Sequence, residues 1–207
     1  MINGQRSMIR LFVLMVCLVL PLTVVAAPVA PVTALEQLRQ GFAGMQDFTA
    51  EIVQEKQLAV MKKKLVSTGT VRFKKPDLFF MELKPPHASR MVLRDTSIEL
   101  YLPQEKNRQQ IALPADEGLK RWLGLLAKPI TTLPDGVKVQ AERHNDSQTV
   151  SITPGKPGQV RSFTITSGFD GRPRKLVIEE RNGNRTAITF KGLRANVGLS
   201  EKDFKVE

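Results

Sequence analysis

The sequence predicts a mainly β (α+β) fold, in which one strongly curved antiparallel sheet carries short helices over its apolar face. Two patterns support this prediction. Apolar and polar residues alternate through most of the chain after residue 47, as they do in strands with one buried face. Two stretches, 33–45 and 114–129, instead repeat apolar residues at three and four positions, which is typical of amphipathic helices. Because a bare apolar face aggregates, the helices are expected to cap the concave side.

The first 26 residues are predicted to be a cleaved signal peptide. Arg6 and Arg10 precede an apolar run over residues 11–22, and small residues suited to cleavage follow. A retained membrane anchor is the alternative, because the whole apolar stretch nearly reaches the 20 or so residues that span a bilayer. Cleavage leaves residues 27–207 as a single secreted domain.

Composition restricts the chemistry of the secreted part. Cys17 is the only cysteine and lies in the predicted signal peptide, which excludes disulfides, thiolate metal sites and cysteine nucleophiles from the remainder. The formal charge of +11 falls to +9 without Arg6 and Arg10, so the surface favours anionic partners. Anionic lipid head groups or an acidic docking protein fit the compartment better than nucleic acid does. The run of lysines at 62–64 is interpreted as a solvated loop.

A first helix is predicted to begin near Thr33, which has the spacing of a capping box with Glu36. Its apolar stripe consists of Leu35, Leu38, Phe42 and Met45. Gly41 and Gly44 each cost a helix about 1 kcal/mol relative to alanine. The helix should therefore depend on docking its stripe, and it is interpreted as a cover over the sheet.

Strands follow the helix and should pair as a meander. The segment 78–81 is apolar on both faces, which makes it a candidate cavity wall. Turn signals include Asp170-Gly171 and Asn182-Gly183, whose residues tolerate positive φ. The predicted strands cover residues 48–52, 69–73, 78–81, 91–93, 98–102, 137–141, 150–152, 160–165, 176–178 and 187–190.

A second helix is predicted between Pro114 and Pro129. Its apolar stripe consists of Leu119, Trp122, Leu123 and Leu126, with Lys120 and Arg121 on the opposite side.

The motifs of common enzymes are missing from the sequence. It contains no G-x-S-x-G elbow, no H-E-x-x-H helix and no Gly-rich phosphate loop. His87 and His144 lie among turn residues, and the acid pairs Glu179-Glu180 and Asp116-Glu117 are interpreted as solvated surface. No enzymatic activity, cofactor or metal is predicted, and the scarcity of exposed aromatic residues disfavours nucleic-acid binding.

A resemblance to a known family rests mainly on residues 73–79, Phe-Lys-Lys-Pro-Asp-Leu-Phe. This segment resembles the LolA family, whose members carry a basic residue, Pro, Asn or Asp, Leu and Phe after a glycine-containing strand. Residues 35–54 resemble the family's opening helix and first strand, and residues 93–95 and 100–103 also fit. The final third is similar in strand rhythm more than in identities.

The resemblance implies an unclosed antiparallel barrel with helical lids over an apolar cavity. Family members carry the acyl chains of lipoproteins through the periplasm, from an inner-membrane ABC transporter to an outer-membrane acceptor; the partners expected here are therefore acylated cargo, that donor and that acceptor. A monomer is expected. The lid candidates are Leu38, Phe42, Trp122 and Leu126. The cavity candidates are Ile52, Val71, Phe73, Phe79, Met81, Met91, Leu93 and Leu100.

Several positions depart from the family's pattern. Lys75 stands where an arginine helps to hold the lid closed, and a lysine lacks the planar fork that binds several carbonyls. Met81 replaces a common tryptophan, Thr96 replaces a glycine, and the family's longer tail is missing after Phe204. An adaptable cavity with Met81 and Met91 would suit glycolipids or other acylated products.

Two alternatives to a carrier remain open, of which a hydrolase that consumes its lipid is the weaker. In the other alternative, the apolar residues form an ordinary filled core with no cavity, which is what apolar alternation usually indicates. The protein would then be a membrane-associated adaptor that binds anionic lipid or an envelope protein through its basic surface.

Overall fold

A computed structural model describes residues 27–61, 63–113, 128–133, 135–155 and 158–205. The predicted signal peptide and most of the predicted second helix, with Trp122 and Leu126, lie outside these residues. Within the described part, no helix combines the length and the hydropathy needed to cross a bilayer.

One antiparallel sheet of twelve strands dominates the structure and does not close into a barrel, which confirms the predicted fold class. The order across the sheet is β1-β8-β9-β10-β11-β12-β2-β3-β4-β5-β6-β7. The strands are β1 (Ala27–Pro28), β2 (Asp47–Gln57), β3 (Lys64–Lys74), β4 (Leu78–Leu83), β5 (Ser89–Arg94), β6 (Ser97–Leu102), β7 (Asn107–Ala112), β8 (Lys138–Arg143), β9 (Ser147–Thr153), β10 (Val160–Gly168), β11 (Pro173–Glu180) and β12 (Arg185–Ala195).

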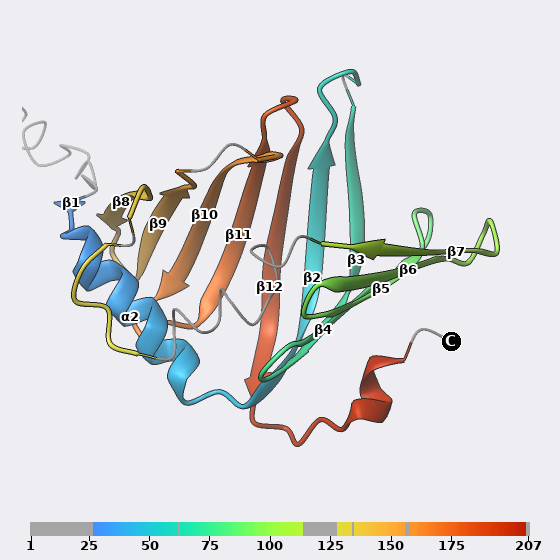
Figure 1. The fold of residues 1–207 in the computed structure, drawn as a ribbon, viewed down its shortest axis with the longest axis horizontal. Helices are drawn as coiled ribbons and strands as arrows, with labels where there is room; N and C mark the ends of the chain where they lie inside the picture. Colours follow the sequence, from blue (N-terminus) through green and yellow to red (C-terminus); the bar gives the residue numbers. More distant parts are fainter. Residues whose placement is uncertain (1–26, 62, 114–127, 134, 156–157, 206–207) are drawn as a thin grey trace, which may run out of the picture.

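The sheet is strongly curved. In Figure 1 the strands from β8 to β3 stand side by side, whereas β4 to β7 run across the view. All ten strands predicted from the sequence are present and pair as two meanders, which the β12–β2 pairing joins. The predicted turns are also present: Gly171 and Gly183 have φ of +74° and +86°, a conformation that favours glycine.

Strand β7 was not predicted from the sequence. Its six residues are all exposed, so no apolar alternation marks it. The strand forms because its backbone pairs with β6, for example Ile111 with Ile98. The sequence of β7 therefore carries no local strand signal, since the segment is extended only because it pairs with β6.

The two faces of the sheet carry different cores. The inner face, defined here as the one that bears Ile52, Val71 and Phe73, has a buried cluster that also contains Met45 and Phe48. On the outer face, a 3₁₀ helix η1 (Glu201–Phe204) places Phe204, which is 0% exposed, against Leu78, Phe80 and Val92. This arrangement explains why residues 78–81 are apolar on both faces: the chain's own C-terminal segment covers the outer one.

The helix α2 (Pro31–Ala43) begins earlier than predicted, and the predicted capping box is wrong. Its N-cap is Ala30, without a side-chain cap, and Pro31 occupies the first turn, where its missing N–H costs nothing. Glu36 instead accepts hydrogen bonds from Arg39 and from the backbone N–H of Ile130. A charged guanidinium three residues away competes successfully for this carboxylate.

Candidate functional site

The eight predicted cavity residues all lie on the inner face. Strand register places Val71 opposite Met81, Met81 opposite Met91, and Met91 opposite Leu100. The pairing thereby forms a continuous apolar row across four strands. A second, parallel row runs through the cross-strand partners Phe48, Phe73, Phe79, Leu93, Ile98 and Ile111.

Burial decreases along these rows from the middle of the sheet toward β7. Ile52, Val71 and Phe73 are 2%, 0% and 4% exposed and belong to the packed core. Phe79 and Met81 are half-buried against that core. The three remaining candidates are half-buried and belong to none of the core clusters that the described residues form: Met91, Leu93 and Leu100. The apolar inner face thus extends beyond the core that the described side chains fill.

Helix α2 packs on this same face. Leu38 is 4% exposed and, with Ala34 and Leu35, contacts Val139 and Val150 of β8 and β9. Phe42, one turn later, packs against the core cluster of β2 and β3. The helix therefore crosses the inner face, with its N-terminal half on β8 and β9 and its C-terminal end near β2 (Figure 1).

A close backbone contact joins α2 to the β10–β11 turn. A Cβ placed on Gly41 would lie 2.4 Å from the carbonyl carbon of Gly171, and one on Gly171 would lie 2.4 Å from the Gln37 oxygen. Neither position has room for a side chain. Gly41, which the sequence marks only as a weak point of the helix, is therefore the residue that lets the helix approach the sheet.

Lys75 contacts the C-terminal end of α2. Its Nζ donates hydrogen bonds to the carbonyl oxygens of Phe42 (2.8 Å) and Ala43 (3.1 Å). A cation is favourable there because the last carbonyls of a helix carry partial negative charge. Burial lowers the pKa of Lys75 from its ordinary value. One ammonium group thus reaches two carbonyls without the planar fork of an arginine.

Glu36 fastens the helix to the chain segment that begins at residue 128. Its carboxylate lies 2.7 Å from both the Nε and an Nη of Arg39 and 2.8 Å from the backbone nitrogen of Ile130. These contacts, with the Arg39 hydrogen bonds as the largest cause and the Ile130 N–H next, lower the pKa of Glu36 to about 2. The ionised carboxylate therefore holds α2 against the 128–133 segment.

An open pocket of about 620 Å³ lies where the β8–β9 and β10–β11 turns meet β12. Apolar side chains of Phe190 and Leu193 line it, together with the ion pair of Arg174 and Asp146 at 2.6 Å. Sequence reasoning missed this pocket because its lining comes from three separated segments, none with a distinctive motif.

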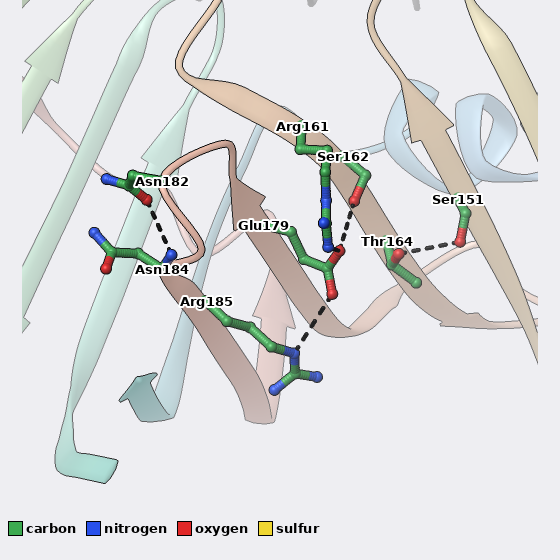
Figure 2. Close-up of polar contacts among 8 residues, drawn as sticks. All are labelled: Ser151, Arg161, Ser162, Thr164, Glu179, Asn182, Asn184 and Arg185. Carbon is green, nitrogen blue, oxygen red and sulfur yellow. Dashed lines mark hydrogen bonds and ion pairs between the residues drawn. The ribbon is translucent and has the colours of Figure 1, made fainter. Parts of the chain in front are cut away.

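The outer face of β9 to β11 is polar. Figure 2 shows Glu179 between Arg161, Ser162 and Arg185, and the hydroxyl of Thr164 bonded to that of Ser151. The Arg161 hydrogen bond lowers the pKa of Glu179. Glu179 is thus half-buried in an ion-pair network rather than simply solvated, as the sequence had suggested. This surface offers no apolar binding area, so the inner face is the candidate site.

Other predicted surface residues behave as expected where they are described. His87 and His144 are both exposed in connecting segments, and Asp116-Glu117 lies outside the described residues. Among the described residues, no cluster of three or more His, Cys, Asp or Glu side chains has the arrangement of a metal site.

The described residues thus form a curved, unclosed antiparallel sheet with a helix over its apolar inner face. A comparison with family models identifies the family to which the chain belongs. The model described as outer membrane lipoprotein carrier protein LolA matches residues 43–207, and the chain belongs to this family. The family consists of carriers that act outside the cytoplasm and bind lipid cargo, so the protein is not an enzyme.

Solved structures with a similar fold include a LolA superfamily protein from Nitrosomonas europaea (10% identity, 86% of this chain and 98% of that one, TM-score 0.45). A putative outer membrane lipoprotein-sorting protein domain from Vibrio parahaemolyticus has 14% identity over 84% of this chain and 96% of that one, with a TM-score of 0.47. Lipoprotein LppX of Mycobacterium tuberculosis has 11% identity over 82% and 97%, with a TM-score of 0.44. A search of curated proteins found no match.

The glycine contact generates a first prediction. Gly41→Ala should lower the free energy of unfolding by about 1–3 kcal/mol, because the added methyl overpacks against the Gly171 backbone even though alanine favours helix. Gly44→Ala is the matched control, since a Cβ there meets nothing within 4 Å. Urea unfolding and hydrogen exchange of the α2 amides measure the effect. Equal stability of the two variants would contradict the proposed role of the contact.

The Glu36 contacts predict a pH dependence. The pKa of Glu36 is lowered on folding, so its contribution to stability is fully present above about pH 4.5 and is lost as the pH falls toward 2. The difference in unfolding free energy between the wild type and Glu36→Gln should therefore shrink between pH 6 and pH 3. A difference that stays constant over this range would show that the carboxylate's charge does not hold the helix.

Proposed function

We propose that this protein is a single-domain periplasmic carrier that shields the acyl chains of lipoproteins or related lipid-linked cargo on its inner face. The observation that carries the proposal is the apolar surface of Phe79, Met81, Met91, Leu93 and Leu100, which continues from the packed core yet stays half-exposed. The chain's membership of the LolA family supports the same reading.

The energetics of acyl chains favour such a surface. Each buried methylene contributes about 0.8 kcal/mol, so exposing a C16 chain to water costs more than about 10 kcal/mol. An apolar sheet face removes this cost while the cargo crosses the aqueous space. Transfer then runs from an inner-membrane donor to an outer-membrane acceptor, provided that the acceptor binds the cargo more tightly.

Helix α2 is the lid in this proposal. Leu38 and Phe42 cover apolar residues of the same face that receives the cargo. Cargo and helix therefore compete for apolar surface, and this competition keeps the net affinity low enough for release. The hydrogen bonds from Lys75 to Phe42 and Ala43 set how firmly the lid stays closed.

The cross-strand pair of Met81 and Met91 favours a broad choice of cargo. Methionine has three rotatable bonds and a polarisable sulfur, so the pair adapts to acyl chains of different shape. Glycolipids and other acylated products therefore belong to the proposed cargo alongside lipoproteins. A transfer assay that found strict selectivity for lipoproteins would overturn this extension.

Phe79→Glu tests cargo binding. A carboxylate in the middle of the apolar rows is costly to bury, so acylated molecules that co-purify with the wild type should be lost and affinity for a fluorescent fatty acid should fall at least tenfold. Val66→Glu is the matched control, because Val66 is 49% exposed and its cross-strand partner Glu55 lies on the outer face. Mass spectrometry of bound lipids and a probe titration provide the measurements.

The result contradicts the proposal if the wild type carries no acylated molecule and binds no probe, or if both variants lose binding equally. Thermal unfolding of both variants separates lost binding from lost folding.

Lys75→Met tests the lid. Without the two hydrogen bonds, we expect hydrogen exchange at the C-terminal end of α2 and release of the acyl probe to accelerate about tenfold, which corresponds to about 1.4 kcal/mol. Lys75→Arg should retain slow release, since a guanidinium reaches the same carbonyls. Lys84→Met, at an exposed lysine, is the control. Unchanged release from Lys75→Met would remove Lys75 from lid closure.

A further inference from the structure

The tip of the β2–β3 hairpin exposes apolar side chains to solvent. Val60 is 93% exposed and Met61 is 42% exposed. A hydrogen bond from the Met61 N–H to the Leu58 carbonyl (3.0 Å) closes the turn, so the two side chains project from an ordered backbone. Two adjacent large apolar side chains that are exposed at a turn contribute little to the core, so their surface is available to an apolar partner.

A second hairpin tip supports the first. The side chain of Asn184, in the β11–β12 turn, accepts a hydrogen bond from the Ala59 N–H at 3.0 Å. The backbone N–H of Arg181 donates to the Gln159 carbonyl, and its Nε donates to the Gly158 carbonyl. Both hairpin tips lie at the same end of the sheet in Figure 1. The β11–β12 turn therefore braces the apolar tip, and residues 158–159 in turn contact the β11–β12 turn.

This end of the sheet is rich in basic residues. Lys56, Lys63 and Lys64 flank the tip along the hairpin, and Arg181 and Arg185 lie at the neighbouring turn. The acidic residues nearby already have partners: Glu55 is paired with Lys64 at 2.9 Å, Glu179 contacts Arg161 and Arg185, and Glu180 accepts hydrogen bonds from the amides of Asn182 and Asn184. Even with these pairs, basic residues outnumber acidic ones at the end of the sheet that carries Val60 and Met61.

We propose that this end of the molecule docks on an anionic lipid bilayer, with Val60 and Met61 entering the head-group region and Lys63 and Arg181 facing lipid phosphates. An apolar tip at an end of the sheet with an excess of basic residues matches an interface that is apolar below and anionic above. A convex tip needs no preformed pocket in its partner, which favours a deformable bilayer over a folded protein. The positive charge of the whole chain draws it toward the same surface.

The docking surface is separate from the proposed cargo site. Lys75 and the C-terminal end of α2 lie beyond the other ends of β2 and β3, and each of these strands has eleven residues. At about 3.3 Å per residue, the tip stands roughly 35 Å from the Lys75 contact. The inference therefore does not rest on the proposed function: it predicts membrane contact whether or not the inner face binds acyl chains.

Vesicle binding tests the docking surface. The protein is purified in the form that expressing cells produce, with its N-terminal residue determined so that any retained apolar leader is recognised. We expect co-sedimentation with phosphatidylglycerol-containing vesicles, little with pure phosphatidylcholine, and a decline as salt rises. Val60→Asp and Lys63→Glu should each weaken binding at least fivefold. Val197→Asp and Lys205→Glu, at exposed positions away from the tip, should bind like the wild type.

Insertion is measured directly with a dye. An environment-sensitive dye on Val60→Cys should shift to shorter wavelength on anionic vesicles, whereas the same dye on Val197→Cys, at a position 42% exposed, should not. Cys17, in the predicted leader, is the only native cysteine. Equal binding to neutral and anionic vesicles, or equal losses in tip and control variants, would overturn the proposal. So would binding to native envelope membranes but not to protein-free vesicles, which would indicate a protein partner. Acyl-probe binding by Val60→Asp stays at the wild-type level, which distinguishes this test from that of the cargo site.

Discussion

The antiparallel pairing of β2 with β12 holds the whole arrangement together. It joins strands that lie far apart in the sequence, from Arg185 opposite Gln57 to Ala195 opposite Phe48. Local hairpins alone would give two separate meanders, β2 to β7 and β8 to β12. The pairing brings Phe190 opposite Ile52 and so makes the apolar inner face continuous across both halves. Closing so long a loop is entropically costly, and the buried inner core offsets that cost.

The end of β12 also sets the path of the C-terminal segment. A register shift between Lys191 and Arg194, with Gly192 at φ +57°, bends the end of β12. Just beyond it, the carboxylate of Asp47 accepts hydrogen bonds from the backbone N–H groups of Val197, Gly198 and Leu199. These bonds direct the C-terminal segment to the outer face, where Phe204 is buried. The C-terminal segment thereby covers the apolar part of the outer face on β4 and β5, whereas the apolar inner face extends beyond its packed core.

The sequence predicted what depends on local pattern and missed what depends on tertiary contact. Alternation located ten strands, and glycine turns located the reversals. The alternation could not locate β7, because its residues are all exposed and are extended only through pairing with β6. Glu36 had the right spacing for a cap, but Arg39 and Ile130 compete for it in three dimensions. Gly41 weakens an isolated helix, but in the folded protein it lets the helix backbone lie directly against Gly171, which no local pattern indicates. The contact of Lys75 with α2 was suggested by family resemblance, not by any pattern in the residues.

Graded burial along the inner face indicates how a lid and a cargo divide the surface. Helix α2 is anchored as far as its last turn: Glu36 binds Ile130, Leu38 is buried on β8 and β9, and Gly41 touches Gly171. Its C-terminal end rests on the half-buried Phe42 and on the two Lys75 hydrogen bonds. The half-exposed cavity candidates lie on the β4–β6 side, beyond that weaker end. In the proposed carrier, a cargo that enters from this side would displace Phe42 before it meets Leu38, and the helix would open by a hinge near Gly41. Lid closure in this proposal would depend on the two hydrogen bonds that the Lys75 ammonium donates, rather than on unfolding the helix.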